Sequence, residues 1–288
     1  MDSSNARIDL ALYPRKPTHL LTTTSGFVAL NLGELWQSHE LLLSLAWRDI
    51  RARYKQTLLG ALWILVHPVL AAGIFTFIFT LVADLKAPSG LPYFLFTFAG
   101  LLAWNGFSAV LNRSSGALVT NAALVSKIYF PRLILPLATV LTVVVDFLVT
   151  LALLAVLLVL FWHLPGWSLL FMPVCVALLW ALALGIGLCA AAIAVTYRDA
   201  LYVLPVLTQF LMWASAVLFP PEQVPSKYLT ILYLNPLVSL IEAFRWSVLG
   251  VGRMRWTAFG YSAALVVIVL LCGTIAFRRM ERRFADVI

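Results

Sequence analysis

Charged side chains are scarce in this chain. Of its 288 residues, 11% are Asp, Glu, Lys or Arg and 62% are hydrophobic. A soluble domain carries about 25% charged residues, so these charges are too few to cover a surface that faces water. An intrinsically disordered chain is excluded, because disorder needs low hydrophobicity and high net charge. The composition disfavours a cytosolic enzyme and predicts a membrane protein.

Residues and motifs of reactive sites are also scarce. No G-x-x-x-x-G-K-[ST], G-x-S-x-G or H-E-x-x-H string occurs, so this chain alone is not expected to hydrolyse nucleotide or to be a hydrolase. The cysteines lie in apolar runs without metal or redox spacing, and no histidine has a second ligand at metal spacing. We therefore expect no catalytic residue, metal or cofactor in this chain. The residues concerned are Cys175, Cys189, Cys272, His19, His39, His67 and His163.

Apolar residues gather in six stretches that are each about long enough to cross a bilayer as a helix. The third has thirty residues, or about 45 Å of helix, so we expect it to tilt or to project from the membrane. The sequence thus predicts an all-α membrane protein with six transmembrane helices. Their expected ranges are 61–83, 92–111, 133–162, 167–195, 201–219 and 257–277.

The distribution of basic residues predicts the orientation. Six spans put both termini on one side, and with both termini inside, fifteen of the twenty Lys and Arg fall on the cytoplasmic side. Cytoplasmic loops carry such an excess, so the net charge of +8 reflects topology and requires no nucleic acid. The first sixty residues lack the pattern of a cleavable signal peptide. The prediction is a multi-pass membrane protein with cytoplasmic termini.

Before the first span, aromatic and basic residues predict an amphipathic helix. Trp36, Leu43, Trp47, Ile50 and Tyr54 recur at helical spacing on one face. A helix with aromatics on one side and Arg and Lys at its end lies in the membrane interface. It can serve as a surface anchor or as a docking surface for a partner, and both alternatives stay open. Its candidate functional residues are Trp47, Arg48, Asp49, Arg51, Arg53 and Tyr54.

The outer segment 220–255 contains a second short helical pattern over 237–249. Thirteen residues reach about 20 Å, which is too short to cross, so we expect a re-entrant or interfacial helix. Pro236 suits its first turn. Glu242 and Arg245 are three residues apart and can pair on one face.

Asp146 is the one acid deep within a predicted span. An ionisable group in the membrane is costly, and it is a functional-site hypothesis by default. A helix–helix hydrogen bond or an aqueous cavity is favoured over proton coupling, because the sequence shows neither an inverted repeat nor a relay partner.

Aromatic residues within the spans have two interpretations. They can face lipid and pack in interfacial belts, or some can line a conduit in which flat rings contact sugar faces. The candidates for such a lining are Trp63, Phe75, Phe79, Trp104, Phe210, Trp213 and Phe219.

Four strings resemble a known family. They are LAWRDIRARYKQTLLGALWILVHPVL over 45–70, LVSKIYFPRLILP over 124–136, YRDALYVLPVLTQFLMW over 197–213 and LNPLVSLIEAFRWSVLG over 234–250. In order and spacing, they resemble the membrane subunit of bacterial ABC exporters for polysaccharides and polyol phosphates, the group with the O-antigen, capsule and teichoic-acid permeases. The resemblance covers about residues 34–280.

The resemblance implies a homodimer of six-helix subunits with two copies of a separate cytoplasmic ATPase, which binds ATP and Mg. It implies export of a lipid-linked glycan, most readily O-antigen, through a channel in the membrane. Two cytoplasmic turns would meet the ATPase, and the outer segment would form an extracytoplasmic gate. The implied coupling residues are Lys127, Tyr129, Phe130, Arg132, Tyr197, Arg198 and Asp199, and the implied gate residues are Asn235, Pro236, Glu242 and Arg245.

The chain is thus divided into a polar tail over 1–31, the interface helix over 32–56, the membrane domain over 57–280 and a cytoplasmic tail over 281–288. Two alternatives remain. One is a permease for another ABC export cargo, such as teichoic acid, capsule, lipid or drug. The other is a membrane glycosyltransferase, which would need paired acids on an outer loop that the sequence does not show.

Overall fold

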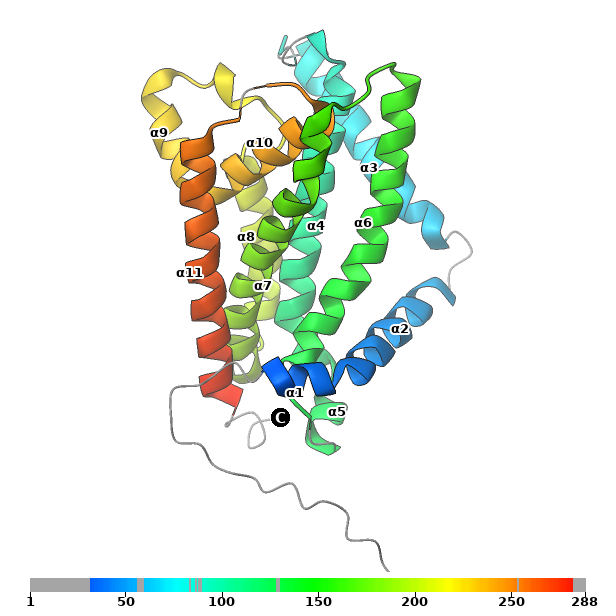
Figure 1. Cartoon of the computed structure of the whole chain (residues 1–288), viewed down its shortest axis with the longest axis vertical. Coiled ribbons are helices and arrows are strands. Elements are labelled where there is room, and N and C mark those ends of the chain that lie inside the picture. The colour runs from blue at the N-terminus through cyan, green and yellow to red at the C-terminus, as the bar shows by residue number, and fades with distance from the viewer. Residues whose placement is uncertain are drawn as a thin grey trace, which may run out of the picture. The chain divides into compact units, whose positions relative to one another are not determined.

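The computed structural model describes residues 32–55, 60–82, 84–85, 87, 90–127, 130–252 and 254–281. Within these residues every regular element is helical, and Figure 1 shows the long helices gathered as a bundle. The all-α prediction is therefore confirmed for this part of the chain. The predicted tail over 1–31, and the predicted C-terminal tail apart from Glu281, lie outside the described residues.

Five segments of the described chain are long and apolar enough to cross a membrane. They match five of the six predicted spans. The remaining predicted span, 201–219, contains α8 (Ala200–Ala214), whose fifteen residues rise about 22 Å. The five segments are Trp63–Val82 in α3 (Gly60–Phe77) and the π-helical turn η2 (Ile78–Val82), α4 (Tyr93–Thr120), α6 (Ile134–Leu160), the 3₁₀ turn η4 (Trp167–Phe171) with α7 (Met172–Thr196), and α11 (Trp256–Glu281).

Helix α4 lies at the centre of the bundle and packs against α3, α6, α7 and α10 (Pro236–Leu249). Phe98 and Phe107 of α4 are fully buried. Helices α7 and α11 also pack closely, because glycines face each other where they meet. A Cβ atom on Gly273 would lie 2.1 Å from the carbonyl oxygen of Gly185. Small residues of this kind allow helix backbones to pack tightly in membranes.

Two predicted boundaries are wrong. The second span continues beyond residue 111, because α4 runs to Thr120 and its polar residues find partners in the bundle. Arg113, expected in a loop, therefore lies within α4. The fifth span ends at Ala214, and the backbone then turns through Ala216, whose φ is 50°. Local sequence does not show this turn, since a distant arginine binds it, as described below.

The amphipathic helix is present but interrupted. A turn at Ser38 separates α1 (Leu32–Gln37) from α2 (His39–Lys55). His39 Nδ1 lies 2.8 Å from the carbonyl oxygen of Trp36, across this turn. Helix α2 packs mainly against α6, and Leu45 and Ala46 are buried.

The outer segment forms three short helices, the 3₁₀ turn η5 (Pro221–Gln223), α9 (Ser226–Leu234) and α10. Helix α10 confirms the predicted pattern over 237–249 and its start at Pro236. The Asn235 side chain caps it by accepting a hydrogen bond from the N–H of Leu237 at 3.1 Å. Gly250 ends it with a φ of 66°, a conformation that favours glycine.

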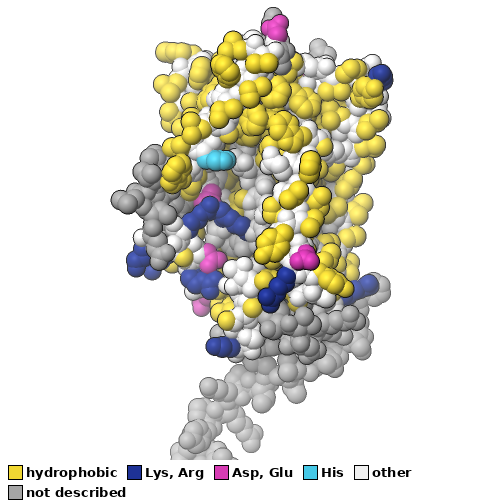
Figure 2. Space-filling view, turned by 180° about the vertical axis from the view of Figure 1, so that it is seen from behind, with side chains coloured by type: hydrophobic (Ala, Val, Ile, Leu, Met, Phe, Trp, Pro, Cys, Tyr) yellow, Lys and Arg dark blue, Asp and Glu magenta, His cyan; other side chains and the backbone are white. Residues whose placement is uncertain are grey.

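Figure 1 distinguishes two ends of the bundle. Helix α5 (Ala122–Lys127) lies near one end, together with the C-terminal end of α11, and we name this the α5 end. Helices α9 and α10 lie toward the opposite end, which we name the α10 end. Hydrophobic side chains dominate the upper part of the face in Figure 2, and most of its Lys and Arg side chains lie lower down.

Candidate functional site

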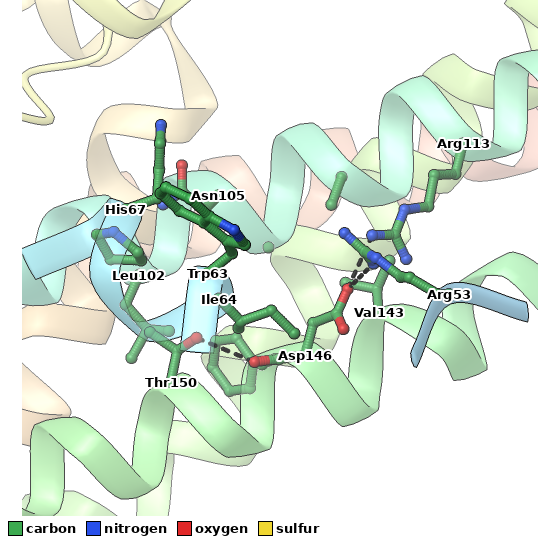
Figure 3. Close-up of a pocket in the computed structure, with 14 residues that line it drawn as sticks. Arg53, Trp63, Ile64, His67, Leu102, Asn105, Arg113, Val143, Asp146 and Thr150 are labelled. Carbon is green, nitrogen blue, oxygen red and sulfur yellow. Dashed lines mark hydrogen bonds and ion pairs between the residues drawn. The ribbon is translucent and has the colours of Figure 1, made fainter. Parts of the chain in front are cut away.

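Three charged side chains from three helices meet in the bundle (Figure 3). Arg113 of α4 donates a hydrogen bond to a carboxylate oxygen of Asp146 on α6 at 2.8 Å, and Arg53 of α2 donates to the same oxygen. Arg113 also donates to the hydroxyl of Thr142 at 3.0 Å. We name Arg53, Arg113 and Asp146 the charged triad. It ties α2, α4 and α6 together.

The charged triad explains how Asp146 is accommodated in a predicted span. Its side chain is 16% exposed, and a carboxylate at such a place needs cationic partners. Sequence reasoning misses both partners, because it places Arg113 in a loop and Arg53 on a surface helix. A predicted second span that continued to Thr120, about two and a half turns further, would have included Arg113.

The charged triad borders a cavity of about 460 Å³ between α2, α3, α4 and α6. Most of the exposed surface of this cavity is apolar, as on its walls at Ile64, Pro68 and Phe147, while His67 and Asn105 add polar groups. Trp63, one of the predicted conduit aromatics, also lines it. The cavity therefore combines an apolar wall with a charged end.

At the α5 end, predicted coupling residues divide into exposed and packed groups. Tyr197, Arg198 and Asp199 are exposed on the turn between α7 and α8, and Lys127 is exposed at the end of α5. Phe130 is 7% exposed and packs in the core. Tyr129 lies outside the described residues. The exposed group offers a surface that a partner can contact.

Arg132 is bound to the end of α11. Its backbone N–H donates to a carboxylate oxygen of Glu281 at 3.2 Å, and its guanidinium donates to the carbonyl oxygen of Glu281. This contact joins the start of α6 to the last turn of α11. Sequence reasoning names Arg132 but misses its partner, 149 residues away.

The outward face of α2 carries the predicted aromatic and basic residues. Trp47 is 55% exposed, and the Arg51 guanidinium lies 5.0 Å from the centre of its ring. Arg48 pairs with Asp49 at 2.8 Å and donates to the side chain of Asn121 at 2.8 Å. The latter bond links α2 to the junction between α4 and α5. The side chain of Tyr54 lies outside the described part of the chain.

Predicted conduit aromatics occupy two environments. Trp104 is 4% exposed and packs against Phe107 in the core of the chain. By contrast, Trp63, Phe210 and Trp213 are exposed, and the others are half-buried. Phe75 of α3 meets Trp213 of α8 edge-on, with ring centres 6.0 Å apart. These exposed rings stay candidates for a lining, whereas the position of Trp104 indicates a packing role.

Arg245 of α10 is bound to backbone. Among the described residues no hydrogen bond or ion pair joins it to Glu242, so the pairing that their spacing allows is not formed. The Arg245 guanidinium donates to the carbonyl oxygen of Ala216 at 3.1 Å and to that of Val217. It also lies 3.9 Å from the ring centre of Phe96. The turn after α8 leaves these carbonyls without helical partners, and Arg245 supplies the donors. Asn235 and Pro236 of the predicted gate form the start of α10, and their role in a gate stays a prediction.

Glu242 pairs with α9. The hydroxyl of Tyr233 donates to its carboxylate at 2.6 Å. Burial raises the pKa of Glu242 above its usual value of 4.5, although the hydrogen bond from Tyr233 and the charge of Arg255 act in the opposite direction. Burial likewise raises the pKa of Tyr233, and the neighbouring carboxylate adds to this effect. The contact between α9 and α10 thus contains a carboxylate that burial makes easier to protonate.

The fold and these surfaces define an apolar helical membrane protein with exposed turns at one end and a capped outer helix at the other. Residues 40–249 match the family described as ABC-2 type transporter, and the chain belongs to that family.

Named relatives agree with this membership. The chain is 33% identical to the O-antigen export system permease protein RfbA of Myxococcus xanthus, over 74% of this chain and 81% of that protein. It is 26% identical to the protein of the same name from Klebsiella pneumoniae, over 90% of this chain and 97% of that protein. It is 27% identical to the polysialic acid transport protein KpsM of Escherichia coli, over 81% of this chain and 91% of that protein.

Proposed function

We propose that this chain is the membrane permease of an ABC exporter that carries lipid-linked polysaccharide, in particular O-antigen, across the bacterial inner membrane. The observation that carries the proposal is its similarity to O-antigen export permeases over most of both chains. The apolar bundle supports this role, because five described segments suit a membrane.

The functional unit is a homodimer with two copies of a cytoplasmic ATPase. This chain contains no phosphate-binding loop in its sequence, so nucleotide and Mg bind to the partner. The α5 end faces the cytoplasm, where the exposed residues Lys127, Tyr197, Arg198 and Asp199 contact the ATPase. The exposed aromatic face of α2 lies in the membrane interface.

Six crossings fit this function better than five. Figure 1 shows α8 leading from the lower part of the bundle back toward α9 and α10. Its fifteen residues are short for a span, and the turn that follows is held inside the bundle by Arg245. In this arrangement α10 is a re-entrant gate helix at the periplasmic end, and the aromatic residues of α3 and α8 line the path of the glycan.

The test is complementation of a bacterial strain that lacks its own O-antigen permease. Expression of this chain with a candidate ABC ATPase from the same genome should restore surface O-antigen, detected by immunoblot of lipopolysaccharide. A Lys in the phosphate-binding loop of that ATPase, changed to Ala, provides the inactive control. Accumulation of O-antigen in the cytoplasmic leaflet despite expression of both chains in the membrane would contradict the proposal.

Charge reversal tests the coupling surface. We expect Arg198→Glu combined with Asp199→Lys to lower export and cargo-stimulated ATPase activity at least tenfold, because both residues are exposed on the turn proposed to dock. The matched control is Lys227→Glu, an exposed reversal at the α10 end. Wild-type export by the double variant would place the docking surface elsewhere.

A capsular polysaccharide is the second candidate cargo. Similarity to the polysialic acid transport protein KpsM favours it. The same complementation, carried out in a strain that lacks its capsule permease, separates the two cargoes by which polymer reaches the surface.

A further inference from the structure

We propose that the cavity beside the charged triad binds the phosphate group of a membrane lipid, with the lipid chain along its apolar wall. The inference deepens the proposed function and rests on it in one respect, namely that a phosphate-bearing lipid carrier is the physiological ligand. The charge, shape and position of the cavity support the site itself.

The charged end of the cavity suits an anion. Among the described residues that line it, two guanidiniums and one carboxylate leave one excess positive charge, apart from any charge on His67. Structural pairing of Asp146 needs only one cation, yet Arg53 and Arg113 both donate to the same oxygen. The planar guanidinium suits phosphate oxygens, which it can bind through two parallel hydrogen bonds. Two such groups on two helices can hold a phosphate from two sides.

The wall of the cavity next to the charged triad is apolar. Ile64, Pro68, Val143 and Phe147 line the cavity next to the charged triad. Its volume of about 460 Å³ is within the range of small-molecule pockets. A soluble phosphate would leave this wall exposed to water, whereas a hydrocarbon chain would cover it. The combination therefore favours an amphiphile over a free anion.

The arginines of the cavity lie at the depth of a lipid headgroup and are accessible to a ligand. Arg113 lies seven residues before Thr120, the last residue of α4, or about 10 Å from that end of the helix. That distance from the end of a span is close to the headgroup region of a bilayer. The side chains of Arg53 and Arg113 are 48% and 28% exposed, so a ligand can reach them. The aromatic ring of Trp63 lies on the same cavity.

Asp146 acts in this site as an internal anion. Its carboxylate holds the two guanidiniums together while the cavity is empty, and an incoming phosphate competes for the same donors. A neutral residue of the same shape should therefore strengthen binding of phosphate, whereas loss of either arginine should weaken it. A merely structural triad predicts loss in both cases, so the signs distinguish the two roles.

The experiment measures lipid binding to the purified full-length chain by native mass spectrometry in detergent. The probes are dioleoyl phosphatidic acid and undecaprenyl monophosphate, with dioleoyl phosphatidylcholine as the zwitterionic control and inorganic phosphate as the soluble competitor. The variants are Arg113→Gln, Arg53→Gln and Asp146→Asn. The matched control is Arg279→Gln, which removes one exposed positive charge at the end of α11. Thermal unfolding of each variant verifies that it is folded.

We expect Arg113→Gln and Arg53→Gln to weaken binding of a lipid phosphate about tenfold, the effect of a lost charge-assisted hydrogen bond. Asp146→Asn should strengthen it about threefold or more, and Arg279→Gln should change it less than twofold. Preference for undecaprenyl monophosphate identifies the cargo carrier as the ligand, and equal binding of phosphatidic acid identifies a general lipid phosphate site. Equal affinity for phosphatidylcholine, or weaker binding by folded Asp146→Asn, would overturn the proposal.

Failure here is distinguishable from failure of the proposed function. Lipid binding is measured on this chain alone, whereas export is measured in cells together with the ATPase. Export by wild type without lipid binding to the cavity would reject only this site, and lipid binding without complementation would reject only the assigned cargo.

Discussion

Individual polar side chains determine how the short helices at the α10 end are held. Arg245 binds backbone carbonyl oxygens, and Glu242 binds a tyrosine hydroxyl. Both residues could be chosen from the sequence because they are charged residues in an apolar helical pattern. Their partners could not, since those lie in a turn after α8 and on a separate helix, α9. Pairing by spacing alone gave the wrong partner, because each side chain points to a different element.

At Arg245 we expect the guanidinium fork, rather than its charge, to be essential. Arg245→Lys keeps the charge but cannot donate to the carbonyl oxygens of Ala216 and Val217 in the same planar geometry. Loss of one such buried hydrogen bond costs about 2 kcal/mol, which should appear as a lower temperature of thermal unfolding in detergent. The exposed control Lys227→Arg should leave it unchanged, and an equally stable Arg245→Lys would refute the geometric argument.

At Glu242 we expect a pH effect on stability. Because burial raises the folded-state pKa above the ordinary value of 4.5, the folded chain binds this proton more tightly than the unfolded chain. The stabilisation is therefore complete below pH 4.5 and is lost as pH rises through the raised pKa. Glu242→Gln keeps a neutral side chain and removes the dependence.

The measurement for Glu242 is thermal unfolding against pH for wild type and Glu242→Gln. The difference between the two curves isolates this carboxyl from the other titrating groups. The unfolding temperature of wild type should fall relative to that of Glu242→Gln as pH increases above 4.5. A constant difference across this range would show that the pKa of Glu242 is the same in the folded and unfolded states.

Among the elements, the close contact between α7 and α11 can be tested at Gly273. Gly273→Ala would place a Cβ atom 2.1 Å from the carbonyl oxygen of Gly185, a distance that atoms cannot adopt without moving the helices apart. Overpacking of this kind costs about 1–3 kcal/mol. We expect a clear loss of thermal stability and of monodisperse protein after purification.

The matched control for this contact lies on the same helix. Gly260 has no atom within 4 Å of its ideal Cβ position, so Gly260→Ala should be neutral or stabilising by about 1 kcal/mol because alanine favours helix. If Gly273→Ala proved as stable as Gly260→Ala, the tight approach of α7 and α11 would be wrong.

The helices themselves were the most predictable part of the fold, since long apolar runs identify spans without tertiary information. Pro236 also predicted the start of α10, which Gly250 ends in the structure. The predicted helix ends were wrong where contacts with distant residues determine them. Helix α4 retains Arg113 because Asp146 on another helix binds it, and α8 stops where Arg245 can bind the turn. The cavity was not predictable, as its walls come from α2, α3, α4 and α6.

For the whole molecule, the number of crossings determines whether α1 and the last turn of α11 lie on the same side of the membrane. With α8 as a sixth crossing, the sides of α1 and of the last turn of α11 are the same, and α9 is on the opposite side. With the five longer segments alone, α1 and the end of α11 would be on opposite sides. The Lys and Arg distribution in the sequence favours the first arrangement.

Cysteine labelling in spheroplasts distinguishes these arrangements. We expect a membrane-impermeant maleimide to label Lys227→Cys on α9 in intact spheroplasts and to label Gln37→Cys and Arg279→Cys only after permeabilisation. All three positions are exposed, so burial does not protect them, and wild type measures the background from Cys175, Cys189 and Cys272. Labelling of only one of Gln37→Cys and Arg279→Cys before permeabilisation would mean an odd number of crossings. In that case α8 would not cross, and the last turn of α11 would lie on the side of the membrane opposite to α1.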